Sequence, residues 1–415
     1  MIDTGSTGFM MICSSYVFFM TPGLAFFYGG LCRRKNVVNT MMSSIFIMGL
    51  ASVLWVAIGY SLSFGGNVGG IIGTFQNAFL NGVGWEPGTY SDQIPGLVFV
   101  AFQMMFAIIT PALLTGSVVG RMNFKALFLF IILWSLVVYY PLAHMVWGEG
   151  GFLAAIGSVD FAGGNVVHIS SGVSGLVLSL ILGKRLGSEQ GNFLPHNIPF
   201  VVLGASLLWF GWFGFNAGSE FAADGVAALA LVNTVVASGS ALISWVIVER
   251  VKVGKPTLVG AATGLVAGLV VITPAAGFVE PWAALVMGLI VSPICYFAIS
   301  FCKAKIGYDD ALDAFGCHAV GGIVGGICTG IFCVPELSWT DFGGLIYTGD
   351  ASLLGSQILG ILITIVFVGV LDVVIGLIVK TCFKGSLRVS EEEEAQGLDV
   401  AAHGESAYPA YIGLD

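Results

Sequence analysis

Two histidines stand at matching positions in two apolar segments of the chain. His168 follows Asp160 by eight residues, and His318 follows Asp310 by the same interval. Glycines stand four and seven residues after each histidine. An ionisable side chain at membrane depth is costly, and it usually faces a polar partner or a cavity. The repeated pattern therefore predicts that His168 and His318 meet and form a functional site.

The composition is that of an integral membrane protein. Of its residues, 57% are hydrophobic and only 9% are charged, and the mean hydropathy is +0.95. Its 59 glycines indicate membrane helices in close contact. The net charge of −9 owes much to acids in the segment 391–415, so nucleic acid is not an expected ligand. The eight cysteines form no Cys-x-x-Cys pair. We therefore expect buried free thiols, and neither a disulfide framework nor a metal or cofactor site is indicated.

Apolar runs long enough to cross the bilayer predict eleven membrane-spanning helices. The first run has no basic residue before it and leads directly into the second, so we expect it to be retained and not cleaved. The predicted spans lie near 6–31, 37–64, 95–119, 124–146, 163–182, 197–219, 225–248, 257–273, 281–302, 312–333 and 353–379.

Basic residues test this count because cytoplasmic loops collect lysine and arginine. All 15 of them fall beside alternate connections. The other connections contain acids and no base: 65–94, 147–162, 220–224, 274–280 and 334–352. The pattern predicts an all-α protein with its N-terminus outside and its C-terminus inside. We expect a membrane domain over 1–384 and a cytoplasmic tail over 385–415.

An odd number of spans also fits an internal repeat. If each histidine segment is the fifth helix of its unit, repeat one covers about 6–182 and repeat two, inserted in the opposite orientation, about 197–333, with a final helix at about 353–383. Inverted repeats are typical of transporters whose site lies at the repeat interface near the midplane. The alternative is chance recurrence of histidine and spaced glycines in a glycine-rich chain.

Aromatic residues are the other chemical resource of the membrane segments. Phe102 and Phe106, Trp147, and Trp212 with Phe215 are candidates, because ring faces can hold a cation after its water is removed. Each also has a purely structural interpretation, since tryptophans often anchor a membrane interface and phenylalanines face lipid or core. The acids Asp313 and Asp372 complete the polar inventory, and a helix-packing role is the alternative for Asp372.

Several of these residues belong to longer motifs. The chain resembles the ammonium transporter (Amt/Mep/Rh) family in Phe102-Gln-Met-Met-Phe106, His144-Met-Val-Trp147, Asp160 with His168, Trp212-Phe-Gly-Phe215-Asn-Ala-Gly-Ser219 and Asp313-x-Phe-Gly-x-His318. The tail motif between Leu387 and Asp399 is similar to that of the bacterial and archaeal Amt branch.

The resemblance implies a role for each matching residue. Phe106, Trp147 and Ser219 would form an outer ammonium site, and Phe106 and Phe215 a ring gate below it. Trp212 would line the pore, where His168 and His318 would be a hydrogen-bonded pair. Asp160 would be structural, accepting backbone hydrogen bonds at its helix N-terminus, and Asp313 would be structural near the pore.

The implied protein is a transporter of the cell membrane that takes up nitrogen, and not an enzyme. It would recruit ammonium, deprotonate it and conduct ammonia past the twin histidines, with an electrogenic proton relay. The family implies a homotrimer and a PII-type signalling protein docking at the inner face. The alternatives are an ammonium sensor that signals through a partner, a membrane oxidoreductase with the histidines as haem ligands, and a neutral-solute channel.

Three positions depart from the family pattern. Glu149 and Glu220 stand at the expected outer mouth where relatives carry small or neutral residues. They would either concentrate cations or be ordinary solvated loop charges. Gly120 stands where an acid commonly precedes the arginine, here Arg121.

Overall fold

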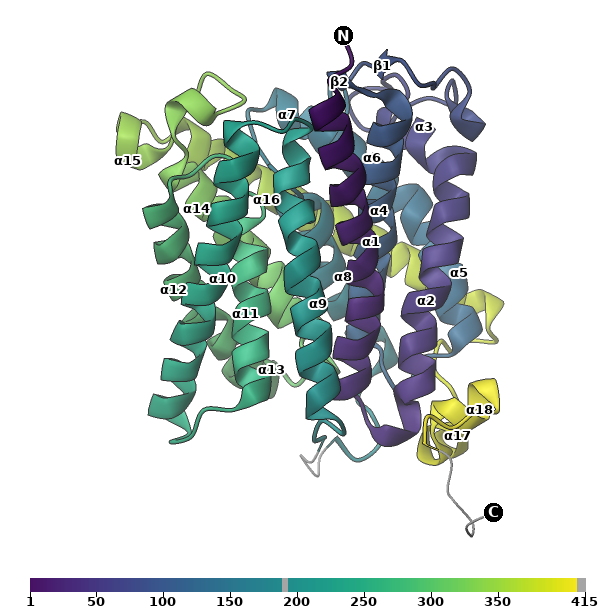
Figure 1. The fold of residues 1–415 in the computed structure, drawn as a ribbon. Helices are drawn as coiled ribbons and strands as arrows, with labels where there is room; N and C mark the ends of the chain where they lie inside the picture. Colours follow the sequence, from purple (N-terminus) through teal and green to yellow (C-terminus); the bar gives the residue numbers. More distant parts are fainter. Residues whose placement is uncertain (189–192, 409–415) are drawn as a thin grey trace.

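The protein is almost entirely helical in the computed structural model, which describes residues 1–188 and 193–408. The N-terminal end of α1 and the last helix, α18, lie at opposite ends of a helical bundle (Figure 1). The first half of the chain forms α1 (Thr4–Leu31), α2 (Val37–Leu54), α3 (Tyr60–Phe64), α4 (Gly96–Leu114), α5 (Phe124–Trp134), α6 (Tyr140–Trp147), α7 (Phe152–Ala155) and α8 (Ser170–Leu182). A short hairpin of β1 (Pro87–Gly88) and β2 (Ser91–Pro95) lies at the outer end.

The second half continues the bundle and ends in the tail. Its helices are α9 (Ile198–Ala217), α10 (Gly225–Lys252), α11 (Leu258–Ile272), α12 (Pro281–Phe297), α13 (Lys303–Ile306), α14 (Val320–Phe332), α15 (Leu345–Thr348), α16 (Ser352–Cys382), α17 (Glu391–Gln396) and α18 (Leu398–His403).

The predicted membrane spans are confirmed. Ten helical segments of the described chain are long and apolar enough to cross a bilayer, and the shorter apolar α11 supplies the eleventh crossing. Their bounds differ from the predicted ones by only a few residues. Five of the described spans contain π-helical turns within or before regular helix: 34–64, 124–155, 164–182, 281–301 and 315–332.

Polar side chains fix where several helices begin. Asp3 accepts a hydrogen bond from the backbone N–H of Ser6 at 2.6 Å, and Asp224 accepts from Val226 and Ala227. Such caps satisfy N–H groups that have no partner within the helix. They set the boundary between apolar span and polar connection at the residue that the sequence marks.

Glycines let the helices of the bundle approach closely. A Cβ on Gly30 of α1 would lie 2.7 Å from the backbone N of Val201 on α9, and one on Gly214 of α9 would lie 2.7 Å from the Cys13 carbonyl. Real Cβ atoms do not approach so closely, so α1 and α9 pack along small residues in the way expected of membrane helices.

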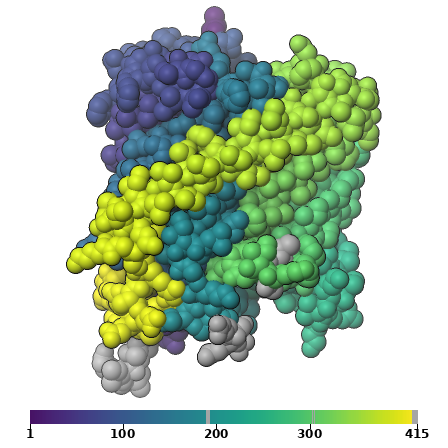
Figure 2. Space-filling model, turned by 180° about the vertical axis from the view of Figure 1, so that it is seen from behind, coloured from purple at the N-terminus to yellow at the C-terminus, as the bar shows by residue number. Residues whose placement is uncertain are grey.

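The long helix α16 lies obliquely across the face opposite to that of Figure 1 (Figure 2). Many of its outward apolar side chains are exposed, Val366 by 62% among them, as expected for a lipid-facing surface. Asp372 is different, because it is fully buried and neither carboxylate oxygen has a hydrogen-bond partner in the described structure.

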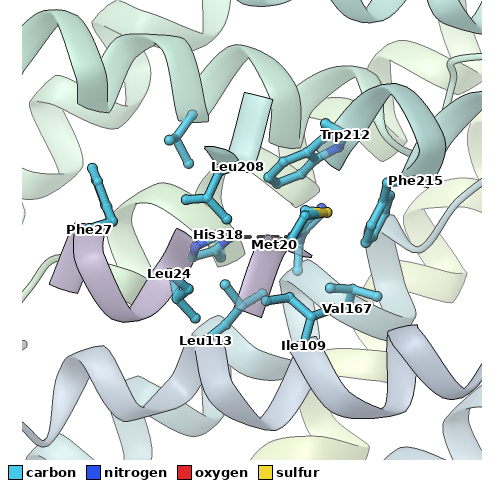
Figure 3. A pocket seen from close by; sticks show the side chains of 12 residues that line it. Met20, Leu24, Phe27, Ile109, Leu113, Val167, Leu208, Trp212, Phe215 and His318 are labelled. Carbon is cyan, nitrogen blue, oxygen red and sulfur yellow. Dashed lines mark hydrogen bonds between the residues drawn. The ribbon is translucent and has the colours of Figure 1, made fainter. Parts of the chain in front are cut away.

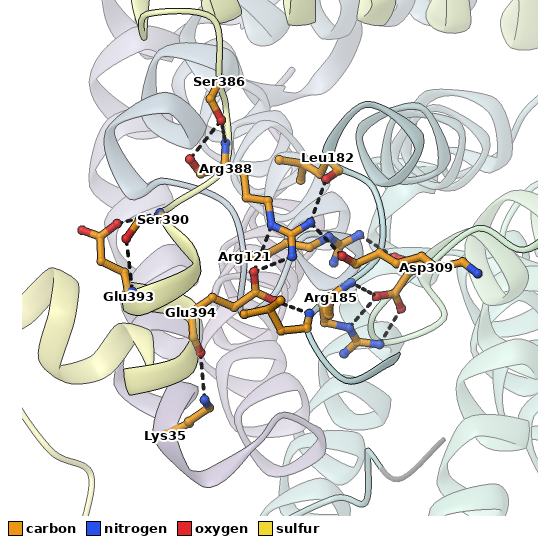
Figure 4. Close-up of polar contacts among 12 residues, drawn as sticks. Lys35, Arg121, Leu182, Arg185, Asp309, Ser386, Arg388, Ser390, Glu393 and Glu394 are labelled. Atoms are coloured by element: carbon orange, nitrogen blue, oxygen red, sulfur yellow. Dashed lines mark hydrogen bonds and ion pairs between the residues drawn. The ribbon is translucent and has the colours of Figure 1, made fainter. Parts of the chain in front are cut away.

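The tail folds back onto the inner end of the bundle (Figure 4). Lys35, just before α2, donates to the carbonyl of Glu394 at 2.8 Å, and the Glu394 carboxylate pairs with Arg388 at 2.5 Å. Asp399 accepts the backbone N–H of Asn39 at 2.9 Å. The tail segment 385–408 is therefore packed against the helices and not free of them.

A second ion pair joins two connections at the inner end. Arg185 donates to both carboxylate oxygens of Asp309, at 2.8 Å from Nε and 2.6 Å from Nη2. Burial alone would raise the pKa of Asp309, but the hydrogen bonds and charge of Arg185 lower it to about 2. Buried Arg121 forms no ion pair in the described structure and donates to the Asp309 carbonyl instead; burial lowers its pKa to about 10.

The cysteines whose side chains are described are free thiols, as expected, and form no disulfide among themselves. Cys382 is exposed and the others are buried, so the expectation of burial is wrong at that one position.

The Arg185–Asp309 pair predicts a pH-dependent contribution to stability. Because the pKa of Asp309 is lower in the folded state, the contribution is complete above about pH 4 and is lost as the pH falls towards about 2. Asp309→Asn should lower the free energy of unfolding by about 2 kcal/mol at neutral pH, and the difference from the native chain should narrow below about pH 4. Unfolding of the solubilised protein across this range measures it. The control is Asp341→Asn at an exposed outer position; equal stability of the two variants at neutral pH would contradict the prediction.

Candidate functional site

His168 and His318 lie in contact in the interior of the bundle, and Figure 3 shows His318 among the side chains that line the cavity beside them. Their Nδ1 atoms are 3.3 Å apart, and the rings are nearly parallel at 18° with centroids 5.3 Å apart. His168 is fully buried and His318 is 4% exposed. Each lies in a π-helical turn, Gly164–Ile169 before α8 and Phe315–Ala319 before α14. Such turns widen a helix locally and are frequent at functional sites.

The glycine four residues after each histidine makes room for the other histidine segment. A Cβ on Gly172 would lie 2.6 Å from the Cβ of Ala319, which follows His318. A Cβ on Gly322 would lie 3.0 Å from the Gly164 carbonyl and 3.2 Å from the Cβ of His168. The repeated glycines therefore let two helices cross at the histidines, which gives the spacing seen in the sequence a direct physical meaning.

A threonine fixes the hydrogen-bonding state of the pair. The Thr273 hydroxyl donates to the Leu269 carbonyl at 2.8 Å and accepts from Nε1 of Trp212 at 2.9 Å. His168 Nε2 is 3.4 Å from the same oxygen. Since the hydroxyl proton is already used, His168 must carry its proton on Nε2 to bond there. Its Nδ1 is then the acceptor, and a neutral His318 donates from Nδ1 and keeps Nε2 free.

Aromatic rings close the passage on the outer side of the histidines. The rings of Phe106 and Phe215 are 4.2 Å apart at 35°. Phe106 also meets the ring of Trp147 edge-on, at 5.9 Å and 88°. Below them, Trp212 lies 5.4 Å from His168 and nearly parallel to it. The rings thus form a continuous series from the outer end of α6 to the histidine pair.

Asp160 organises the turn that begins the His168 segment. Its carboxylate accepts from the backbone N–H groups of Gly163, Gly164 and Asn165 at 2.9, 2.6 and 2.7 Å. Its carbonyl accepts from Nε1 of Trp147 at 2.9 Å. Asp160 therefore holds the start of the turn and orients the Trp147 indole, and it is 2% exposed.

Cavities lie in series along this path. An outer cavity of about 250 Å³ is lined by Trp147 and Ser219, and an inner one of about 250 Å³ reaches His318 and Asp313. Between them, a cavity of about 10 Å³ is lined by both histidines, Trp212 and Phe215 (Figure 3). That is close to the space of one water molecule. The touching rings of Phe106 and Phe215 separate it from the outer cavity.

The remaining acids lie away from the histidine pair. Asp313 is at the inner cavity, paired with Lys303 at 2.6 Å, and Asp372 lies in α16. Glu149 is exposed beyond the outer cavity, and Glu220 is half-buried next to Ser219. Sequence reasoning missed Thr273, whose only signal is its place at the end of an apolar run.

A multi-pass helical bundle with a buried histidine pair between an outer and an inner cavity is an arrangement typical of the ammonium transporter class, and comparison with known proteins identifies the family. Residues 8–408 match the model of the Ammonium Transporter Family. The chain is 49% identical to an ammonium transporter of Bacillus subtilis, covering 98% of this chain and 99% of that one. It is 41% identical to ammonium transporter Amt1 of Archaeoglobus fulgidus, covering 98% and 100%.

Solved structures of the same family have the same fold. Mep2 of Saccharomyces cerevisiae matches with a TM-score of 0.87 and 34% identity, over 94% of this chain and 91% of that one. A protein described as a sensor Amt protein matches with a TM-score of 0.89 and 29% identity, over 96% and 98%. The chain belongs to the ammonium transporter family and is a multi-pass protein of the cell membrane.

The glycine contacts predict that Gly322→Ala separates the histidines. The added methyl group must displace the Gly164 carbonyl or His168 by a few tenths of an ångström, and overpacking of this kind costs about 1–3 kcal/mol. We expect a lower melting temperature and a longer Nδ1–Nδ1 distance in a solved structure of the variant. Gly355→Ala is the control, because a Cβ at this position of α16 would meet no atom within 4 Å. It should neither lower the melting temperature nor lengthen the Nδ1–Nδ1 distance. An unchanged histidine distance in Gly322→Ala would show that the contact does not set the spacing.

Proposed function

We propose that this protein transports ammonium by separating it into ammonia and a proton at the aromatic outer site and passing both along the twin-histidine path. The observation that carries the proposal is the buried contact of His168 and His318 in a passage otherwise lined by apolar and aromatic side chains. Family membership supplies the substrate class.

The outer site binds ammonium but cannot carry it across. Phe106 and Trp147 present ring faces and edges, and cation–π contacts contribute about 2 kcal/mol when desolvated. Ser219, whose hydroxyl proton is donated to the Phe215 carbonyl, keeps a lone pair for an N–H group, and a charged hydrogen bond contributes about 1.5–3 kcal/mol. Moving such an ion fully out of water costs on the order of 20 kcal/mol in the idealised limit. The ion therefore stops above the Phe106–Phe215 gate, which must open for passage.

Deprotonation removes the cost of moving a charge into the apolar passage, and among ammonium, sodium and potassium only ammonium can lose a proton. Desolvation disfavours the charged form of an amine, so ammonium gives up its proton as it moves inward, while sodium and potassium have none to give. Neutral ammonia then passes Trp212 and the imidazole edges. This accounts for selectivity against ions of similar size without a cage of ligands.

The histidine pair relays the released proton. Inward transfer starts from the reversed hydrogen bond, in which His168 donates from Nδ1 and leaves Nε2 free, while His318 carries its other proton on Nε2. The released proton binds His168 Nε2, the Nδ1 proton of His168 passes to Nδ1 of His318, and His318 releases its Nε2 proton towards the inner cavity. The pair is then in the state described above, with His318 donating and His168 accepting, and both imidazoles must change tautomer before the next proton. Transport is electrogenic in this scheme. In the weaker alternative, the imidazoles only form hydrogen bonds with ammonia in transit.

The arrangement in the cell follows the family. We propose a homotrimer with one path in each subunit, in which 1–384 form the transport domain and 385–415 a cytoplasmic tail, built from two inverted repeats. A PII-type signalling protein would dock at the inner face near the docked tail. Neither Glu149, Glu220 nor Asp372 is given a transport role in this scheme.

A sensor is the second candidate function, since the chain is similar to a protein described as a sensor Amt protein. A sensor would bind ammonium at the same outer site and change the contacts of α17 and α18 with the bundle. It would carry no steady current, which separates the two functions.

Proteoliposomes on a supported membrane test the proposal. An ammonium step should evoke a current in the native protein, and an equal potassium step should not. His168→Asp should abolish or strongly reduce the ammonium current, because the aspartate side chain is shorter than the histidine side chain and the carboxylate would no longer contact Nδ1 of His318. Gly355→Ala serves as the matched membrane-helix control.

Undiminished, still ammonium-selective current in His168→Asp would contradict the relay. Native protein that binds ammonium without any current would instead favour the sensor. A current carried equally by potassium would contradict the deprotonation step itself.

A further inference from the structure

The outer cavity has few hydrogen-bonding groups. Its walls are mostly aromatic, and the side chains that can form hydrogen bonds there are Tyr90, Gln103, Ser219 and the indoles of Trp147 and Trp339. The proposed function uses the ring of Trp147 and the hydroxyl of Ser219. Gln103 has no part in it.

Three of these groups already donate a hydrogen bond to a backbone carbonyl. Trp147 Nε1 donates to the Asp160 carbonyl, the Tyr90 hydroxyl donates to the Phe64 carbonyl at 3.1 Å, and Ser219 donates to the Phe215 carbonyl at 2.9 Å. The Tyr90 oxygen also accepts the backbone N–H of Glu149 at 3.3 Å. Trp147 therefore presents its ring to the cavity, and Ser219 presents an oxygen that can still accept a hydrogen bond. These are acceptors for a ligand that carries N–H groups and positive charge.

Gln103 differs from these three groups, and from the exposed Trp339. It lies on α4, three residues before Phe106, and is only 5% exposed. Gln103 lines the outer cavity, and no hydrogen bond joins its carboxamide to a residue that the structure describes. Leaving a buried carboxamide without a partner is costly, so the position calls for a ligand or water on the cavity side.

Ammonium, the ligand proposed for this cavity, has more N–H groups than the side chains assigned so far can accept. Ammonium has four N–H groups; the rings of Phe106 and Trp147 attract its charge, but among side chains only Ser219 is assigned to accept a hydrogen bond. A carbonyl oxygen from the other wall would satisfy a second N–H as water is removed.

We propose that Gln103 is a binding residue for ammonium, with Oε1 accepting an N–H group of the ion in the outer cavity. The proposal rests on the proposed function and extends its outer site by one direct ligand. It assigns Gln103 to recruitment of the ion and not to the proton relay or the gate.

Three variants in proteoliposomes test this role through the half-saturating ammonium concentration of the current. Gln103→Met keeps the length of the side chain and removes the acceptor oxygen, so the concentration should rise about tenfold or more, as expected for loss of a charged hydrogen bond. The maximal current should stay within about twofold of native, since a lost recruitment contact weakens binding without removing the relay. Gln103→Glu keeps acceptor oxygens and adds charge, so its half-saturating concentration should be native or lower. Gln76→Met makes the same chemical change at an exposed outer residue and should match the native protein.

The results separate this inference from the proposed function. If the native protein carries ammonium current and Gln103→Met has the same half-saturating concentration as Gln76→Met, Gln103 is not a ligand. A rise in Gln103→Glu as large as in Gln103→Met would also overturn the assignment, because it would reflect packing and not the acceptor oxygen. If Gln103→Met does not fold, the half-saturating concentration of Gln103→Glu is the test. A native or lower value supports Gln103 as a ligand, and a raised value contradicts it. Absence of ammonium current in the native protein overturns the proposed function instead.

Discussion

The cost of placing a charge in a dry, apolar passage is the constraint on which the rest of the structure depends. A passage with room for about one water molecule cannot hydrate an ion, and the rings of Phe106 and Phe215 close it from outside. Among the described residues, the two imidazoles in contact are the only ionisable groups that line it. The arrangement favours a neutral molecule and a proton moving by separate means over an intact ion.

Small residues and hydrogen-bonded backbone groups allow the helices to enclose this narrow passage. Gly172 and Gly322 let the two histidine segments cross, and the Asp160 carboxylate satisfies the N–H groups that begin one of them. Thr273 then sets which nitrogen of His168 carries the proton. In the proposed relay, this tautomer, in which His318 donates and His168 accepts, is the state that the pair reaches after one inward transfer.

Much of the fold could be predicted from the sequence, because the bilayer requires apolar helices of a certain length and cytoplasmic connections collect lysine and arginine. The meeting of His168 and His318 could be expected from the matched intervals to Asp160 and Asp310. The role of Thr273 could not, since a threonine at the end of an apolar run has no distinguishing pattern. Gln103 stood inside a motif, but only the structure shows that it lines the outer cavity without a hydrogen-bond partner among the described residues. The tail contacts of Lys35 and Asn39 depend on tertiary packing that no local pattern encodes.

The most direct test of the central claim is to count charge and nitrogen in the same proteoliposomes, with electrical current and isotopically labelled ammonium uptake measured together. The account predicts that the native protein moves charge and nitrogen in constant proportion, and that loss of both imidazoles in His168→Ala with His318→Ala abolishes the charge movement. Charge that continues in proportion to nitrogen without the two histidines would contradict the account.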